Sequence, residues 1–137
     1  MSDDRRYLLE ISEKQAHVIS KACEVLARLY MGQFGVVRDC FLTRALSNEI
    51  SDKDWEHLQD LLHTCETLAT GLPRHGYFGI HSPAISDKAR VSFDIHRVVR
   101  HRLAWDRQPT GGFGVDFDAP RATSELHPLL AVVKGAL

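Results

Sequence analysis

The sequence has few cysteines, no long apolar run and almost no net charge. Among its 137 residues, Cys23, Cys40 and Cys65 lie far apart and form no C-x-x-C pair. Because their number is odd, neither a disulfide framework nor a zinc knuckle is indicated, and we expect reduced thiols in or near the core. No segment approaches the roughly 18 apolar residues of a membrane span. The opening MSDDRRYLLE lacks the apolar stretch of a signal peptide, which predicts a cytoplasmic location and no membrane partner,.

An excess of charge of one sign is also missing from the chain as a whole. The formal net charge is -1, which argues against a broad basic face that coats nucleic acid,. Basic charge is concentrated in one place: residues 87–107 contain six Lys or Arg and three Asp, a net +3, whereas the rest of the chain carries -4. This distribution predicts one anion site rather than an extended nucleic-acid track.

Common catalytic and metal-binding motifs are absent. The sequence contains no HExxH pair, no GxSxG elbow and no Walker lysine,. His96 and His101 are five positions apart and point about 140° from each other on a helix. The GGFG run at 111–114 has no strong strand before it and no helix after it, so a phosphate loop is not predicted,. We therefore assign no catalytic residue, metal ligand or cofactor, and a binding protein is favoured over an enzyme.

Length and patterning predict a single domain over residues 1–137, of the α+β class and mainly helical, with three to four helices,. Capping residues, apolar periodicity and glycine stops set the expected helices. These run from Ser12 to Gly32, within 34–46, from Ser51 to Gly71 and from Ser86 to Arg107.

A small two-stranded β element is expected to join the N- and C-terminal regions. The segment 7–11 (YLLEI) is rich in β-favouring residues, and 113–118 (FGVDFD) alternates apolar and polar residues,. Pairing of the two would bring the chain ends together. The segment 129–133 is interpreted either as a last helical turn or as a docking segment for a partner subunit.

The stretch from Gly76 to Arg107 is the predicted working surface. A glycine- and aromatic-rich loop leads into a helix with five arginines and one lysine. Guanidinium groups suit phosphate or carboxylate, and aromatic faces suit a flat ring. The candidate ligand-binding residues are Arg97, Arg100, His101, Arg102, Trp105, Asp106, Tyr77 and Phe78.

Each group in this set has an expected role. The arginines would clamp phosphates, one of the aromatic residues would stack a base, and His101 or Asp106 would contact sugar hydroxyls. Since the arginines lie on different helical faces, one subunit cannot present all of them to one ligand, which implies either a homo-oligomer with a shared pocket or a contribution from the loop.

A plainer interpretation competes with this one. The arginine face would then be a solvated surface with ion pairs such as Arg90 to Asp94, and Trp105 would be a lid on the core. The use of arginine over lysine favours ligand binding, because planar bidentate contacts need the guanidinium. Exposed N–H groups at the helix start, near Ser86, could add to an anion site.

Two segments, YLLEISEKQAHVISKACEVLARLYMGQF and YFGIHSPAISDKARVSFDIHRVVRHRLAWDR, resemble a group of small, mostly uncharacterised proteins encoded by bacteriophages and prophages. The resemblance covers the first expected helix and the central stretch. It implies a phage accessory protein, made in the host cytoplasm, that acts on host defence or metabolism by binding.

Taken together, these features predict a non-enzymatic protein that sequesters an anionic, nucleotide-like small molecule and so counters host defence signalling. Two alternatives stay open. One is an inhibitor that docks its basic helix on a host protein or in a nucleic-acid channel. The other is a phosphate-ester hydrolase whose site is assembled only in the fold.

Overall fold

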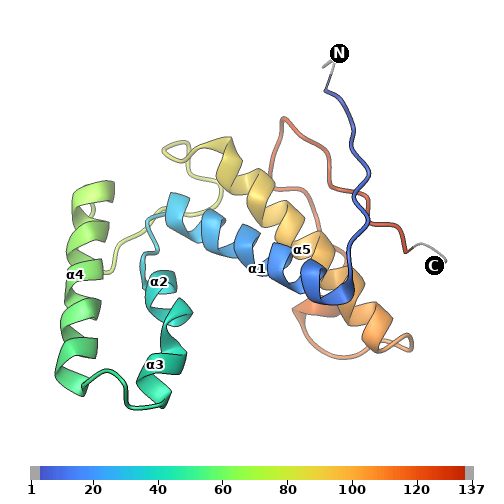
Figure 1. Cartoon of the computed structure of the whole chain (residues 1–137). Helices are drawn as coiled ribbons and strands as arrows, with labels where there is room; N and C mark the ends of the chain where they lie inside the picture. Colours follow the sequence, from blue (N-terminus) through green and yellow to red (C-terminus); the bar gives the residue numbers. More distant parts are fainter. Residues whose placement is uncertain (1–3, 135–137) are drawn as a thin grey trace.

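The computed structural model describes residues 4–134, and over this range the chain forms five α-helices and one 3-10 helix, with no β-strand. In chain order these are α1 (Glu13–Tyr30), α2 (Gly35–Cys40), α3 (Leu42–Leu46), α4 (Asp52–Thr70), α5 (Asp87–Arg107) and η1 (Val115–Phe117). The long helices α1 and α5 pack along each other, and α2, α3 and α4 form an arm at one end of this pair (Figure 1).

The helix boundaries follow local signals in the sequence. The Ser12 hydroxyl accepts the N–H of Gln15 while the Gln15 side chain accepts the N–H of Ser12, which confirms the predicted capping box,. Ser51 and Ser86 cap α4 and α5 in the same way through a first-turn N–H,. Gly71 ends α4 in the left-handed region, at φ 70°,. The single helix expected within 34–46 is instead two short helices that meet at Phe41.

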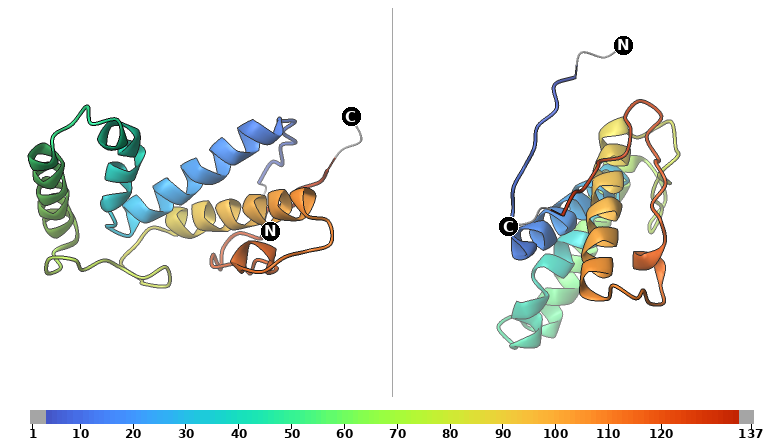
Figure 2. Two further views of the ribbon diagram at one scale, coloured as in Figure 1. Left: turned by 90° about the horizontal axis from the view of Figure 1, so that it is seen from below. Right: turned by 90° about the vertical axis from the view of Figure 1, so that its right-hand side faces the viewer.

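The body of the fold is an antiparallel pair. Figure 2 shows α1 and α5 close together where α1 ends and α5 begins, and diverging toward the start of α1 and the end of α5. Ala27 and Ala89 are fully buried, and side chains this small let two helix backbones approach closely,. Met31 and Ile85 pack with Ala89 in a small core at the close end of the pair.

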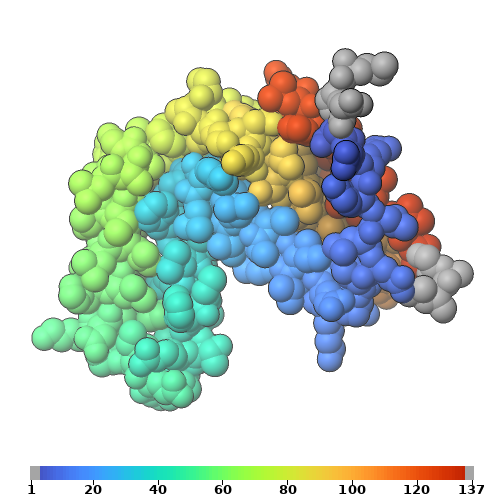
Figure 3. Space-filling view, turned by 45° about the horizontal axis from the view of Figure 1, so that its top comes forward, coloured from blue at the N-terminus to red at the C-terminus, as the bar shows by residue number. Residues whose placement is uncertain are grey.

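A buried carboxylate joins α4 to α2 within the arm. The buried carboxylate of Glu66 on α4 accepts the backbone N–H groups of Phe34 at 2.9 Å and Gly35 at 3.3 Å. These N–H groups lie at the start of α2, where no intrahelical acceptor exists. His63 Nδ1 lies 3.2 Å from the second oxygen of Glu66. In the space-filling view a notch separates the arm from the start of α1 (Figure 3).

The predicted β element is wrong, so the described chain is all-α rather than α+β. The segment 7–11 is extended but exposed, and no neighbouring backbone pairs with it within residues 4–134. Residues 115–117 form η1, which α5 side chains hold: Trp105 Nε1 donates to the Phe117 carbonyl at 3.2 Å, and His101 Nδ1 lies 3.1 Å from the Asp116 carbonyl. Alternation of apolar and polar residues indicates that one face is buried, but a β-strand also needs a neighbouring strand to pair with its backbone N–H and C=O groups.

Asp94 anchors the C-terminal segment to α5. Its buried carboxylate accepts the Thr123 N–H at 2.9 and 3.0 Å, the Thr123 hydroxyl at 2.7 Å and the Ser124 N–H at 3.1 Å. The competing interpretation, in which Asp94 lies on a solvated face and pairs with Arg90, is therefore wrong for Asp94. Residues 129–133 form no helical turn; the segment after η1 runs back along α5 (Figure 2).

The thiols are only partly as predicted. Cys23 is half-buried on α1, and burial raises the pKa of its thiol,. Cys40 and Cys65 are exposed, so they are not core residues. No helix within residues 4–134 is both long enough and apolar enough to cross a membrane.

Candidate functional site

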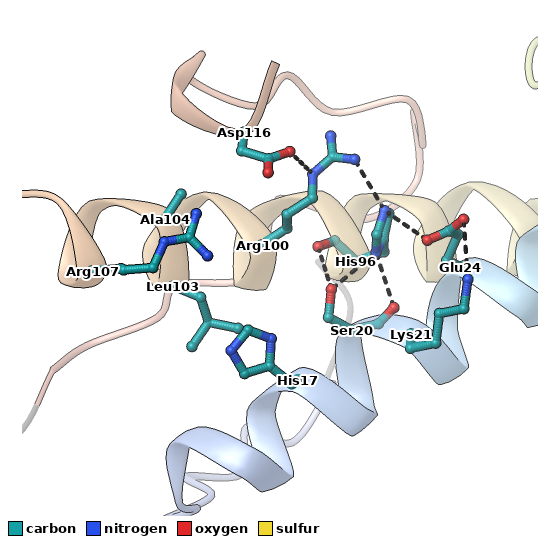
Figure 4. A pocket seen from close by; sticks show the side chains of 10 residues that line it. All are labelled: His17, Ser20, Lys21, Glu24, His96, Arg100, Leu103, Ala104, Arg107 and Asp116. Carbon is teal, nitrogen blue, oxygen red and sulfur yellow. Dashed lines mark hydrogen bonds and ion pairs between the residues drawn. The ribbon is translucent and has the colours of Figure 1, made fainter. Parts of the chain in front are cut away.

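A cleft of about 230 Å³ lies between α1 and α5, where the two helices diverge, and η1 forms part of its wall. Figure 4 shows the side chains around it. They are His17, Ser20, Lys21 and Glu24 from α1, His96, Arg100, Leu103, Ala104 and Arg107 from α5, and Asp116 from η1. The lining therefore combines three segments that are far apart in the sequence.

His96 is the buried centre of the cleft floor. Its Nδ1 lies 2.9 Å from both the carbonyl and the hydroxyl oxygen of Ser20, and the Ser20 hydroxyl also lies 3.1 Å from the His96 carbonyl. All of these groups are satisfied if Nδ1–H donates to the Ser20 carbonyl and the hydroxyl donates to the His96 carbonyl. Burial lowers the pKa of His96; Glu24 opposes this shift, while Arg100 adds to it,.

Glu24 faces the other ring nitrogen of His96. Its Oε2 lies 3.5 Å from His96 Nε2, and its Oε1 accepts from Arg28 Nε at 3.0 Å. Partial burial disfavours the charged carboxylate, but the Arg28 hydrogen bond and the positive charges of Lys21, His96 and Arg28 outweigh it and lower the pKa of Glu24,. Glu24 is thus a fixed negative charge on the α1 side of the cleft.

Arg100 brings a guanidinium group whose hydrogen bonding is incomplete. Its buried Nε lies 3.0 Å from Asp116 Oδ1, but the angle is outside hydrogen-bond geometry, and Nε has no hydrogen-bond partner within the described chain. Its Nη1 lies 3.4 Å from His96 Nε2, a long contact,. Buried N–H groups of a charged side chain are normally paired, so this side chain retains donor capacity for an acceptor in the cleft.

The charge of the cleft is slightly positive. Lys21, Arg100 and Arg107 contribute three positive charges against the carboxylates of Glu24 and Asp116. Lys21 lies 3.7 Å from Glu24, whereas Arg107 forms no ion pair with any residue between 4 and 134. Arg107 and Arg100 are seven positions apart on α5 and share one helical face. An anion in the cleft would meet two guanidinium groups from one side.

The serine, histidine and glutamate of the cleft do not form a nucleophilic triad of the usual geometry. Ser20 Oγ is buried, and the carbonyl of His96 offers its proton an acceptor. In the tautomer that satisfies all of these groups, His96 Nδ1–H donates to the Ser20 carbonyl, so this nitrogen is not a free base for Ser20,. His96 Nδ1 therefore does not activate Ser20 in this arrangement.

The structure separates the predicted phosphate-clamping arginines. Arg100 lines the cleft. Arg97 lies over the Phe93 ring, at 5.5 Å from its centroid, and donates to the Arg121 carbonyl at 3.4 Å. Arg102 Nε lies 3.2 Å from Asp106 Oδ1; around α5, Arg102 is about 160° and Asp106 about 120° from Arg100,. These arginines do not surround one ligand in one subunit, as their different helical faces predicted.

The predicted aromatic residues lie at opposite ends of α5. Phe78 packs against the core of Met31 and Ile85 near the start of the helix, and Tyr77 is 58% exposed beside it. Trp105 is 38% exposed near the helix end, where its ring meets Phe117 at a centroid distance of 5.8 Å. His101 lies on the same side, 6.3 Å from the Trp105 ring. None of these rings lines the cleft.

Sequence reasoning missed most of the cleft. His17, Lys21 and Glu24 were hidden among the polar positions of an ordinary amphipathic helix, and His96 was set aside because its spacing to His101 fits no metal motif. A signal for the site did exist: Ser20 and Glu24 share a face of α1 with the apolar residues that pack on α5. Polar residues on a buried face indicate a polar network between helices.

Comparisons with known proteins give no further assignment. The chain matches no protein-family model, no curated protein and no solved structure. Within residues 4–134 no group of three or more His, Cys, Asp or Glu side chains is placed to hold a metal ion. The resemblance to phage-encoded proteins stays a prediction from the sequence.

Proposed function

We propose that this protein is a non-enzymatic binding protein that captures a small, nucleotide-like anion by its phosphate group in the cleft between α1 and α5. Arg100 and Arg107 would hold the phosphate oxygens from the α5 side. Lys21 would approach from α1, and His17 borders the same space. Guanidinium groups are the side chains best shaped for this contact, because they offer parallel N–H donors to two oxygens.

One observation carries this proposal: two arginines with spare donor capacity line the same cleft. Arg100 Nε is ion-paired with Asp116 at 3.0 Å but makes no hydrogen bond, and Arg107 has no ion-pair partner within the described chain. A bound oxyanion would give Arg107 an ionic partner and offer Arg100 a further acceptor, in a charge-assisted contact with both guanidinium groups.

The size of the cleft restricts what one subunit can hold. About 230 Å³ is below the roughly 300–1,000 Å³ of a pocket for a drug-sized ligand,. A phosphate with part of a sugar fits this volume better than a whole nucleotide. The rest of such a ligand would extend past the mouth of the cleft. The phage resemblance implies a protein that acts on host defence or metabolism by binding, and capture of a nucleotide-like defence signal would be one such role.

The test is isothermal titration calorimetry with inorganic phosphate, pyrophosphate and a panel of nucleoside phosphates. We expect Arg107→Ala to weaken binding at least about tenfold, since a hydrogen bond to a charged group contributes about 1.5–3 kcal/mol. Arg97→Ala is the matched control, because it removes an arginine of the same helix that lies outside the cleft. Its affinity should equal that of the wild type.

Three results would contradict the proposal. They are no binding of any anion in the panel, equal loss in the two variants, or no loss in Arg107→Ala. Incubation followed by chromatography separates capture from hydrolysis: intact recovery of the bound compound fits a binding protein, whereas its conversion would identify a hydrolase.

A further inference from the structure

α1 carries a second apolar face that the fold leaves uncovered. Val18, Ala22, Val25, Leu26 and Leu29 lie on the side of the helix away from α5, and with Lys21 they line a groove of about 510 Å³. All of the groove residues belong to α1, so no other described segment covers it. Val18 is 68% exposed. An apolar stripe of this length on a helix surface indicates a contact with another helix.

α4 carries a matching face. Leu58, Leu61, Cys65 and Leu68 recur at intervals of three and four, and Leu68 is 81% exposed. Glu66, which attaches α4 to α2, projects from a different side of α4 than this row. Leu61, Cys65 and Leu68 are therefore left exposed. The arm therefore presents an apolar row to its surroundings.

We propose that a second copy of this chain docks here, with α4 of each copy lying along the outer face of α1 of the other. The contact joins two different surfaces, and a two-fold axis repeats it once and closes the assembly as a dimer rather than a filament. The α1 face mixes small and large side chains, with Ala22 beside Val25 and Leu29, and the leucines of α4 can interlock with such a row because alternating sizes leave holes for them,.

Charge favours the contact of α1 with α4 over the contacts of α1 with α1 and of α4 with α4. α4 contains five acidic residues and one lysine, a net formal charge of -4. α1 has three basic and two acidic residues, with Lys14, Lys21 and Arg28 along one edge of the apolar face,. Two α4 helices would repel each other, and so would two basic edges of α1. Only the contact between α1 and α4 of different copies brings opposite charges together.

Sedimentation equilibrium tests the assembly. We expect a dimer of the 15.5 kDa chain. Leu68→Asp should raise the dissociation constant at least about 30-fold, because an apolar side chain is lost from the contact and a charge enters it. Leu126→Asp is the control: Leu126 is 76% exposed on the C-terminal segment, outside both faces, and the dimer should persist. A wild-type monomer, or a dimer that tolerates Leu68→Asp, would overturn the proposal.

Cross-linking identifies the faces without disturbing the apolar row of α4. Ala22→Cys is introduced into a chain in which Cys23 and Cys40 are replaced by alanine, so that the native Cys65 is the only other thiol. On mild oxidation we expect a disulfide-linked dimer that disappears when Cys65 is also replaced by serine. A dimer that survives this replacement would mean that α1 meets α1. A disulfide within one chain, or no disulfide, would likewise refute the contact between α4 of one copy and α1 of the other.

Discussion

Replacement of Asp94 by alanine is the strongest test of how the C-terminal segment is held. Asp94 is buried on α5 and accepts hydrogen bonds from the N–H and hydroxyl of Thr123 and from the N–H of Ser124. Those donors lie 29 and 30 positions away in the sequence. The substitution removes the acceptor for all three donors at once and leaves a small gap beside them.

The expected loss follows from these contacts. A hydrogen bond to a charged group contributes about 1.5–3 kcal/mol, and the contributions do not add fully because the freed donors regain water when the segment loosens. We therefore expect the free energy of unfolding to fall by about 3 kcal/mol. For a chain of this length, that loss lowers Tm by about 10 °C.

Urea denaturation followed by circular dichroism measures the free energy of unfolding, and hydrogen exchange at residues 123 and 124 reports the local release. Asp106→Ala is the matched control on the same helix, because its partly exposed carboxylate pairs with Arg102 at 3.2 Å and Lys134 at 3.7 Å. Exposed ion pairs contribute at most about 1 kcal/mol. A loss in Asp94→Ala no larger than that in the control would refute the anchoring role of Asp94.

Two more predictions concern the rest of the fold. Burial lowers the pKa of His96 in the folded protein, so as the pH falls the unfolded chain takes up a proton at this residue before the folded chain does. The contribution of His96 to stability is therefore complete above the ordinary histidine pKa of about 6.5, and it decreases as the pH falls below that value. His96→Gln should flatten this part of a plot of the urea midpoint against pH, and an unchanged slope would contradict the assignment. Gly32 adopts a φ of 81°, and an added Cβ would collide with the Thr70 side chain. Gly32→Ala should lower the free energy of unfolding by more than about 1 kcal/mol, whereas Gly79→Ala, at a position with open space, should change it much less,.

The helices were predictable because their signals are local. The capping box at Ser12, the caps at Ser51 and Ser86 and the stop at Gly71 all act within a few residues, and the structure confirms each. The β element failed for the opposite reason. Segments 7–11 and 113–118 have strand-like patterns, but pairing between them is a long-range event that the pattern does not specify.

For the arginine-rich helix α5, the sequence predicted part of the candidate site. Its concentration of positive charge and its bounds were visible, and Arg100 was named as a candidate. The partners of each arginine were not visible. Arg97 stacks on Phe93, Arg102 pairs with Asp106, and Arg107, outside the candidate set, joins Arg100 in the cleft.

By itself, the sequence determined where the three long helices α1, α4 and α5 begin and end and where basic charge gathers, since both depend on neighbours along the chain. Only the tertiary structure decided that Ser20 meets His96 across 76 positions and that Asp94 turns inward to hold the C-terminal segment. Those outcomes depend on which helix faces come together. The periodicity of α1 predicted one buried apolar face, but it did not show that a second apolar face of the same helix would stay exposed. The same packing that leaves this face uncovered also forms the cleft, because α1 and α5 diverge from their close end.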